Sequence, residues 1–166
     1  MATMAHALTI VYASTSGHTE FVVDTVITRV TNKNNDLKVS KKRAEEASVA
    51  DVTGADVVVL ASSTWNTGNV EGQLNPHMHE LIKTRLNDID LKHKPMTVIG
   101  LGDERYFYTA RAFDALMEFV QLHNGNLFMP GLKIVNEPYD QVEKIERWAA
   151  ELAAQIEKLP AKVEES

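Results

Sequence analysis

The chain has 166 residues, of which 44% are hydrophobic and 24% charged, and its net charge is -6 with a pI near 5.5. One globular domain over residues 1–166, with a core from about 6 to 159, is expected, and the negative charge argues against nucleic acid as a partner. The absence of cysteine excludes disulfides, thiolate metal ligands and cysteine nucleophiles. No stretch approaches a membrane span and no basic segment precedes the first apolar run, so we expect a cytoplasmic protein without a signal peptide.

Apolar strand patterns alternate with amphipathic helix patterns along the whole chain. The predicted strands cover residues 7–13, 37–41, 55–62, 95–100 and 127–135, the last interrupted by Pro130-Gly131. The predicted helices cover 17–31, a short stretch within 44–53, 76–85 with Asn75 as its N-cap, 108–123 and 140–159, followed by a frayed polar tail over 160–166. Five strands alternating with helices predict an α/β protein with a parallel sheet between two helical layers.

The first loop, residues 14–19, reads Ser-Thr-Ser-Gly-His-Thr and lies between the first strand and the first helix. Its hydroxyls, its backbone N–H groups and the positive end of the helix dipole favour one bound phosphate. No lysine follows as in a Walker loop, so the phosphate would rest on amides and hydroxyls, with Gly17 permitting close approach and His18 adding partial charge. The alternative is a Ser/Thr-rich helix cap without a ligand.

Two later loops follow strands of the same sheet and carry aromatic side chains. Residues 62–69 place Trp65 on a polar segment, where covering a flat ligand ring is a natural use and packing against a neighbouring loop is the alternative. Residues 100–108 contain Tyr106, which can face a planar ring; the alternative is a helix-entry loop with inward-pointing aromatics. Ligands of parallel sheets bind beyond the carboxyl ends of strands, so a phosphate site with two aromatic loops indicates flavin mononucleotide (FMN).

The motifs in these loops resemble those of the flavodoxin family, and the resemblance covers nearly the whole chain. Residues 14–19 match the family's phosphate loop, 64–68 match its Thr-Trp-Asn-x-Gly segment, and Gly102, Asp103 and Tyr106 match its Gly-Asp-x-x-Tyr loop. The resemblance implies a flavodoxin-like three-layer α/β/α sandwich with a five-stranded parallel sheet of order 2-1-3-4-5, for which flavodoxin is itself the standard example.

The short segment that contains the last predicted strand implies a short-chain member of the family. Long-chain members carry an insertion of about twenty residues there, and the segment 125–138 leaves no room for one. Two features depart from the family's pattern: His18 stands where asparagine is common, and the net negative charge is modest.

The resemblance also implies roles for residues of the three loops. Trp65 and Tyr106 would cover opposite faces of the isoalloxazine ring, Asn66 or a neighbouring peptide would meet N5, and the backbone around Asp103 and Tyr108 would bind the pyrimidine edge. No catalytic residue and no metal site are expected. The implied FMN-binding residues are Ser14, Thr15, Ser16, Gly17, His18, Thr19, Ser62, Ser63, Thr64, Trp65, Asn66, Thr67, Gly68, Leu101, Gly102, Asp103, Tyr106, Tyr108 and Ala110.

These features predict a low-potential one-electron carrier with non-covalently bound FMN, passing electrons between a reductase and acceptor oxidoreductases. Arg105 is the one Lys or Arg among the matched segments, and nearby Asp103 and Glu104 disfavour added negative charge on the flavin. Partners would dock transiently over small interfaces, and the protein would be a monomer.

Three alternatives use the same fold. An FMN-dependent NAD(P)H:quinone reductase usually needs longer loops than this chain has, and a steady-state assay with NAD(P)H and a quinone would identify one. A phosphoacceptor signalling domain needs an aspartate where Ser62 stands, so we reject it. A flavodoxin-like domain of a multidomain reductase is the third, and the short terminal segments favour a free-standing protein instead.

Overall fold

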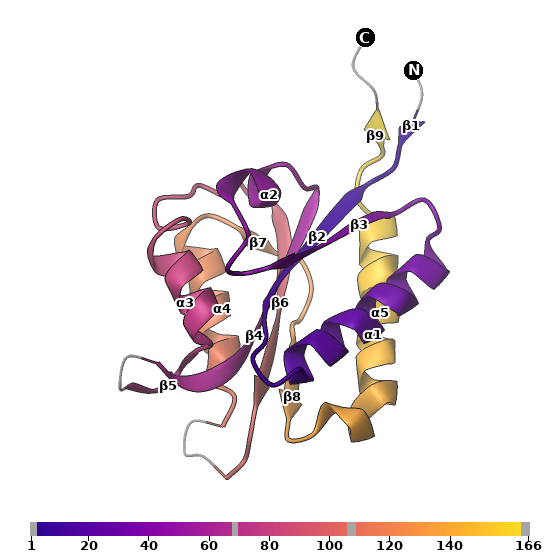
Figure 1. Cartoon of the computed structure of the whole chain (residues 1–166). Coiled ribbons are helices and arrows are strands. Elements are labelled where there is room, and N and C mark those ends of the chain that lie inside the picture. The colour runs from indigo at the N-terminus through magenta and orange to yellow at the C-terminus, as the bar shows by residue number, and fades with distance from the viewer. Residues whose placement is uncertain (1–2, 68–69, 106–108, 164–166) are drawn as a thin grey trace.

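The loops with the predicted motifs follow strands of one twisted parallel sheet (Figure 1). The structure is a computed structural model that describes residues 3–67, 70–105 and 109–163. Its strands are β1 (Thr3–Met4), β2 (Ala7–Ala13), β3 (Lys38–Arg43), β4 (Val57–Thr67), β5 (Val70–Leu74), β6 (Pro95–Gly102), β7 (Asn126–Leu127), β8 (Leu132–Val135) and β9 (Lys162–Val163).

Helices alternate with these strands, as the sequence pattern predicts. The helix expected after residue 75 has Asn75 as its N-cap and proline at its first position, so local sequence alone fixes where it begins. The last predicted helix starts as a single 3-10 turn before it becomes α-helical. The helices are α1 (His18–Lys33), α2 (Val49–Thr53), α3 (Pro76–Lys83), α4 (Arg111–Leu122), η1 (Pro138–Gln141) and α5 (Val142–Glu157).

The order of the parallel strands confirms the predicted topology. The sheet runs β3-β2-β4-β6, and β7 and β8 both pair with β6 as two pieces of the fifth strand. The break between the two pieces falls over residues 128–131, where the sequence has Pro130-Gly131. Counting β7 and β8 as one strand, this is the expected order 2-1-3-4-5.

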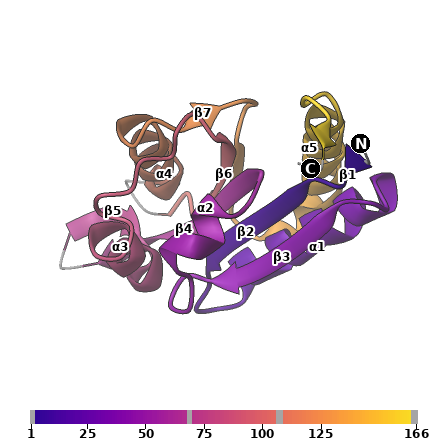
Figure 2. The same ribbon diagram turned by 90° about the horizontal axis from the view of Figure 1, so that it is seen from above.

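Two layers of helices cover the two faces of this sheet (Figure 2). Helices α1 and α5 lie on one face, where buried side chains such as Val26 and Ile145 join the sheet in one hydrophobic cluster. Helices α3 and α4 lie on the other, where Met78 and Leu116 belong to a second cluster. Both faces of the central strands are therefore covered, which explains their nearly continuous apolar sequences.

Two additions to the sheet differ from the sequence-based expectation. Strand β5 pairs antiparallel with the end of β4, so the second predicted loop is an extended hairpin. Strand β9 pairs antiparallel with β1, although residues 160–166 were expected to fray. The reason is a tether, because Lys162 Nζ lies 3.0 Å from a carboxylate oxygen of Asp56, which also accepts a 2.7 Å bond from the Ala7 amide.

Candidate functional site

Three predicted segments meet at one edge of the sheet. Parallel pairing places Ala13 of β2 beside Ser62 of β4, and Ser63 of β4 beside Leu101 of β6. The segments that follow these residues therefore leave the sheet side by side at its carboxyl edge. In Figure 1 this edge is the lower end of the molecule, opposite the two chain termini.

The first segment forms an open turn at the start of α1. Gly17 is the N-cap, with φ of 93°, and as a glycine it has no side chain to cap the first turn of α1. Ser14 Oγ accepts from the Gly17 amide at 3.1 Å and from the Glu20 amide at 3.4 Å, which fixes the curve of the turn. Thr15 and Ser16 are exposed. The turn therefore presents the hydroxyl residues Thr15 and Ser16 to solvent at the positive end of a helix, which suits an anion.

His18 and Thr19, the last two residues of the predicted phosphate loop, lie within the first turn of α1. The His18 Nε2 atom is 3.4 Å from Glu137 Oε2, and its ring meets the ring of Tyr139 edge-on at 5.5 Å between centroids. The Thr19 side chain is buried. The structure thus holds His18 against Glu137 and Tyr139 at the start of η1, at the side of the turn.

A charged cluster neutralises Glu20 beside this turn. Glu20 accepts a 2.6 Å hydrogen bond from the Tyr12 hydroxyl and pairs with Lys41 at 2.9 Å and Arg43 at 3.4 Å. These hydrogen bonds, that from Tyr12 first, lower the pKa of Glu20 from its ordinary 4.5. Burial chiefly raises the pKa of Tyr12. Lys41 and Arg43 therefore compensate the Glu20 carboxylate next to the turn of residues 14–17.

Replacing Glu20 with glutamine should weaken the acid sensitivity of the fold. The pKa of Glu20 is lower in the folded chain than its unfolded value of 4.5. The ionised carboxylate therefore contributes fully to the free energy of unfolding above about pH 5, and this contribution is lost as the pH falls below 4.5 and through the pKa of the folded state. The difference in unfolding free energy between the native chain and Glu20→Gln should therefore shrink between about pH 7 and about pH 4. Urea unfolding at each pH measures this difference, and Glu46→Gln, at an exposed glutamate, is the control. A difference for Glu20→Gln that does not change with pH would contradict the lowered pKa of Glu20.

Trp65 stands at the edge of the site on the β4–β5 hairpin. Strand β4 continues through it, and Trp65 pairs with Gln73 of β5, so an extended strand replaces the predicted loop. The residue is 37% exposed, and its indole N–H donates to Ser63 Oγ at 2.5 Å. A half-exposed indole held by its own polar edge leaves an apolar ring available to a ligand.

The hydroxyls of Ser62 and Thr64 join the segments of the site to each other. Ser62 is fully buried and its Oγ accepts from the Asn75 amide at 3.0 Å. Thr64 Oγ1 donates to the Leu101 carbonyl at 2.9 Å and accepts from the Ala112 amide at 3.0 Å. The hydroxyls of both predicted site residues therefore form hydrogen bonds with the backbone of the chain itself. Those of Thr64 connect the ends of β4 and β6 to the start of α4.

The third segment is a closed loop after β6. The Asp103 amide donates to the Thr109 carbonyl at 3.0 Å, and the Asn136 amide donates to the Gly102 carbonyl at 2.8 Å. Arg105 Nε donates to Asp103 Oδ1 at 2.9 Å, and this contact lowers the pKa of Asp103. Leu101 and Ala110, at the two ends of the loop, are buried. The loop backbone is thus fixed at both ends.

Some predicted contacts lie outside the described part of the chain. These are Gly68, Tyr106 and Tyr108, together with the side chains of Asn66 and Thr67. Of the residues that support the site, sequence reasoning missed the roles of Asn75 and Asn136. Asn75 reads in sequence only as a helix cap, because nothing local connects it to the first loop sixty residues earlier.

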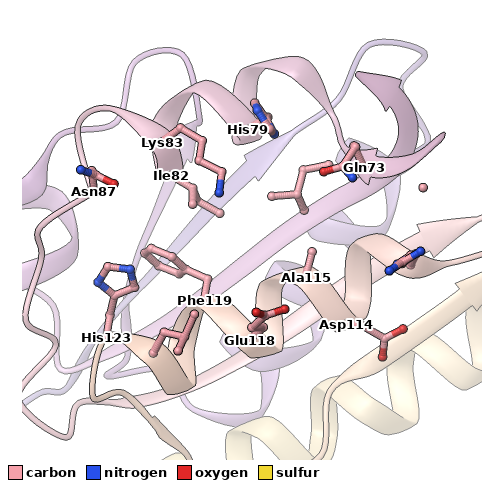
Figure 3. Close-up of a pocket in the computed structure, with 14 residues that line it drawn as sticks. Gln73, His79, Ile82, Lys83, Asn87, Asp114, Ala115, Glu118, Phe119 and His123 are labelled. Atoms are coloured by element: carbon pink, nitrogen blue, oxygen red, sulfur yellow. The ribbon is translucent and has the colours of Figure 1, made fainter. Parts of the chain in front are cut away.

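A cavity of about 350 Å³ lies between α3 and α4, next to β5 (Figure 3). Lys83 and His79 of α3 face Glu118 of α4 across it. Among the described residues, its lining includes none of the predicted FMN contacts. The cavity is therefore separate from the site at the carboxyl edge of the sheet.

The fold and this site define a doubly wound α/β protein with an open, hydroxyl-rich turn at the switch point between β2 and β4. The family model described as Flavodoxin matches residues 10–148. A curated flavodoxin of Maridesulfovibrio salexigens is 34% identical over 148 residues, covering 89% of this chain and 97% of the relative. A flavodoxin of Nitratidesulfovibrio vulgaris is 26% identical over 154 residues, covering 92% and 100%. The crystal structure of oxidised Flavodoxin 2 from Bacillus cereus matches with a TM-score of 0.77 at 26% identity, covering 92% and 98%. The chain belongs to the flavodoxin family.

Membership in this family establishes the class of function. The chain is an FMN-binding electron-transfer protein with transient redox partners, and the quinone reductase alternative gains no support. It is a short-chain member, because β7 and β8 are separated by residues 128–131 alone. None of the described helices is both long and apolar enough to cross a bilayer.

The residues at the carboxyl edge fit FMN. A Cβ added at Gly17 would meet no atom within 4 Å, so the turn is open where a phosphate would lie. The turn contains hydroxyls and amides without a lysine, the donor set that helix N-termini offer to phosphate. The half-exposed indole of Trp65 lies on the extension of β4, the strand next to β2, where it can contact the ring system of a flavin whose phosphate lies in the turn.

Proposed function

We propose that FMN lies across the carboxyl ends of β2, β4 and β6, with its phosphate in the turn formed by residues 14–19. The observation that carries this proposal is the left-handed N-cap at Gly17, which places no side chain over the first turn of α1, together with the exposed residues Thr15 and Ser16 beside it. The first-turn amides, including those of His18 and Thr19, would donate to phosphate oxygens.

At the ring end we propose that Trp65 covers one face of the flavin. Its indole N–H is already bound to Ser63, so the contact with the flavin is apolar stacking. The backbone of the third loop, at Leu101, Gly102, Asp103 and Ala110, would bind the polar edge of the ring. The proposal keeps Asn66, Thr67, Gly68, Tyr106 and Tyr108 as contacts on the strength of the family motifs.

Bound FMN supplies one-electron redox chemistry. The protein's part is to hold the flavin by its phosphate, exclude water from its faces and keep cations away from the ring. Arg105, the cation that the structure describes on the third loop, is paired with Asp103, which supports a low reduction potential. We further propose that the chain works as a monomeric single domain in the cytoplasm and passes electrons from a flavodoxin reductase to acceptor oxidoreductases.

Comparison of FMN with riboflavin, which lacks the phosphate, tests the proposed site. Apoprotein titrated with each flavin should bind FMN at least about a hundredfold more tightly, because two charge-assisted hydrogen bonds contribute about 1.5 kcal/mol each. Quenching of flavin fluorescence measures both dissociation constants. Similar affinities for the two flavins would contradict a phosphate site in the turn.

A further inference from the structure

Asn75 is a buried polar residue that connects the phosphate turn to the rest of the site. It lies between β5 and α3, and its relative exposure is 0%. Buried amides are stable only when their donors and acceptors are bonded, so its partners show what the residue does.

Hydrogen bonds of Asn75 reach three different segments. Its backbone N–H donates to Ser62 Oγ at 3.0 Å and to the Ser63 carbonyl at 3.1 Å, at the end of β4. Its Oδ1 accepts from the His77 amide at 3.0 Å, which caps α3. Its Nδ2 donates to Thr15 Oγ1 at 2.9 Å, in the phosphate turn.

The bond to Thr15 has a defined direction. The His77 amide needs an acceptor, so the oxygen of the Asn75 side chain faces α3 and the NH₂ group faces the turn. Thr15 Oγ1 therefore acts as an acceptor toward Asn75, and its own proton remains to be donated elsewhere. Thr15 is exposed, and a phosphate oxygen in the turn is an acceptor for that proton.

We propose that Asn75 is a positioning residue for FMN, which orients the Thr15 hydroxyl as a hydrogen-bond donor to the phosphate. Among the described residues, this is the one side-chain hydrogen bond that ties residues 14–17 to a distant part of the chain. A chain of bonds from amide to hydroxyl to anion strengthens each member. The inference rests on the proposed phosphate site.

Two substitutions at position 75 separate this role from helix capping. Asn75→Ser keeps a good N-cap residue but is too short to reach Thr15, and it adds no charge. Asn75→Asp also keeps the cap, but a carboxylate can only accept from Thr15, so the hydroxyl proton would point away from the phosphate. Each variant is made in the native chain and in a Thr15→Val background, with Thr15→Ser as the conservative control.

The readout is the ratio of riboflavin to FMN dissociation constants for each full-length apoprotein at about pH 8, with urea unfolding measured alongside. The ratio should fall about tenfold in Asn75→Ser and further in Asn75→Asp. It should stay near the native value in Thr15→Ser. In the Thr15→Val background, Asn75→Ser should leave the ratio unchanged. A merely structural Asn75 would weaken both flavins equally, and that result would overturn the proposal.

The remaining outcomes are also decisive. The proposal is overturned if the ratio of dissociation constants falls in Asn75→Asp but not in Asn75→Ser, because charge repulsion would then explain the loss. It is also overturned if Asn75→Ser lowers the ratio equally with and without the Thr15 hydroxyl, because a general packing effect would then explain the loss. If Asn75→Asp fails to fold, Asn75→Ser and the two Thr15 variants still decide. A native chain that does not prefer FMN over riboflavin would instead contradict the proposed phosphate site itself.

Discussion

Gly102→Ala is expected to destabilise the fold by about 3 kcal/mol or more and to weaken flavin binding with it. An added Cβ at Gly102 would lie 1.5 Å from the Thr109 carbonyl oxygen and 2.7 Å from Ala110 Cα, both of them backbone atoms that cannot rotate away. The closing bond between the Asp103 amide and the Thr109 carbonyl would have to break, opening the third loop. Urea unfolding and FMN titration of the same variant measure the two effects.

Gly17→Ala is the matched control for this substitution. Its Cβ would meet no atom within 4 Å, so the cost is that of a left-handed backbone, about 1 kcal/mol. The two substitutions add the same methyl group to different surroundings. Equal losses of unfolding free energy would show that the third loop is not packed as closely as described.

Trp65→Ala should weaken binding of both FMN and riboflavin by about 1–3 kcal/mol, the range for aromatic stacking on a flat base. The indole is 37% exposed on the hairpin, and its N–H is bound to Ser63, so the ring face is what remains for the flavin. Both flavins have the same ring, so the ratio of their affinities should stay constant. Fluorescence titration with each flavin measures the loss, and Trp65→Phe should restore most of it.

Trp148, the second of the two tryptophans, provides the control. It lies on α5, packs against the core and donates to the Pro130 carbonyl at 2.9 Å, away from the carboxyl edge of β2 and β4. Trp148→Ala should lower the unfolding free energy and leave flavin affinity of the folded protein unchanged. If Trp65→Ala leaves FMN affinity unchanged, the proposed stacking on Trp65 is wrong.

The architecture could be predicted from sequence because burial patterns are local. The run at residues 7–13 is apolar throughout, as a strand covered on both faces must be. Helix α1 was predictable despite many β-branched residues, because Val22, Val26 and Val30 recur on one face and are buried in the structure. Pro130-Gly131 marked the break in the fifth strand for an equally local reason, since proline cannot donate to the ladder.

Features that depend on contacts distant in sequence were not predictable. The terminal β1–β9 pair joins residues about 160 positions apart, and its tether from Lys162 to Asp56 has no local signature. The hairpin after Ser63 has a polar sequence that suggests a loop, and pairing with β5 makes it a strand. The local sequence indicates that Asn75 caps a helix, but its bond to Thr15 exists only because the fold brings the two loops together.

Backbone amide spectra of the chain with each flavin test the central claim most directly. In ¹⁵N–¹H correlation spectra of the apoprotein, FMN should shift the amides of residues 15–19 strongly, riboflavin should leave them nearly unmoved, and both flavins should shift the indole N–H of Trp65. Amides of residues 14–19 that respond equally to both flavins, or to neither, would contradict the placement of the phosphate at the start of α1.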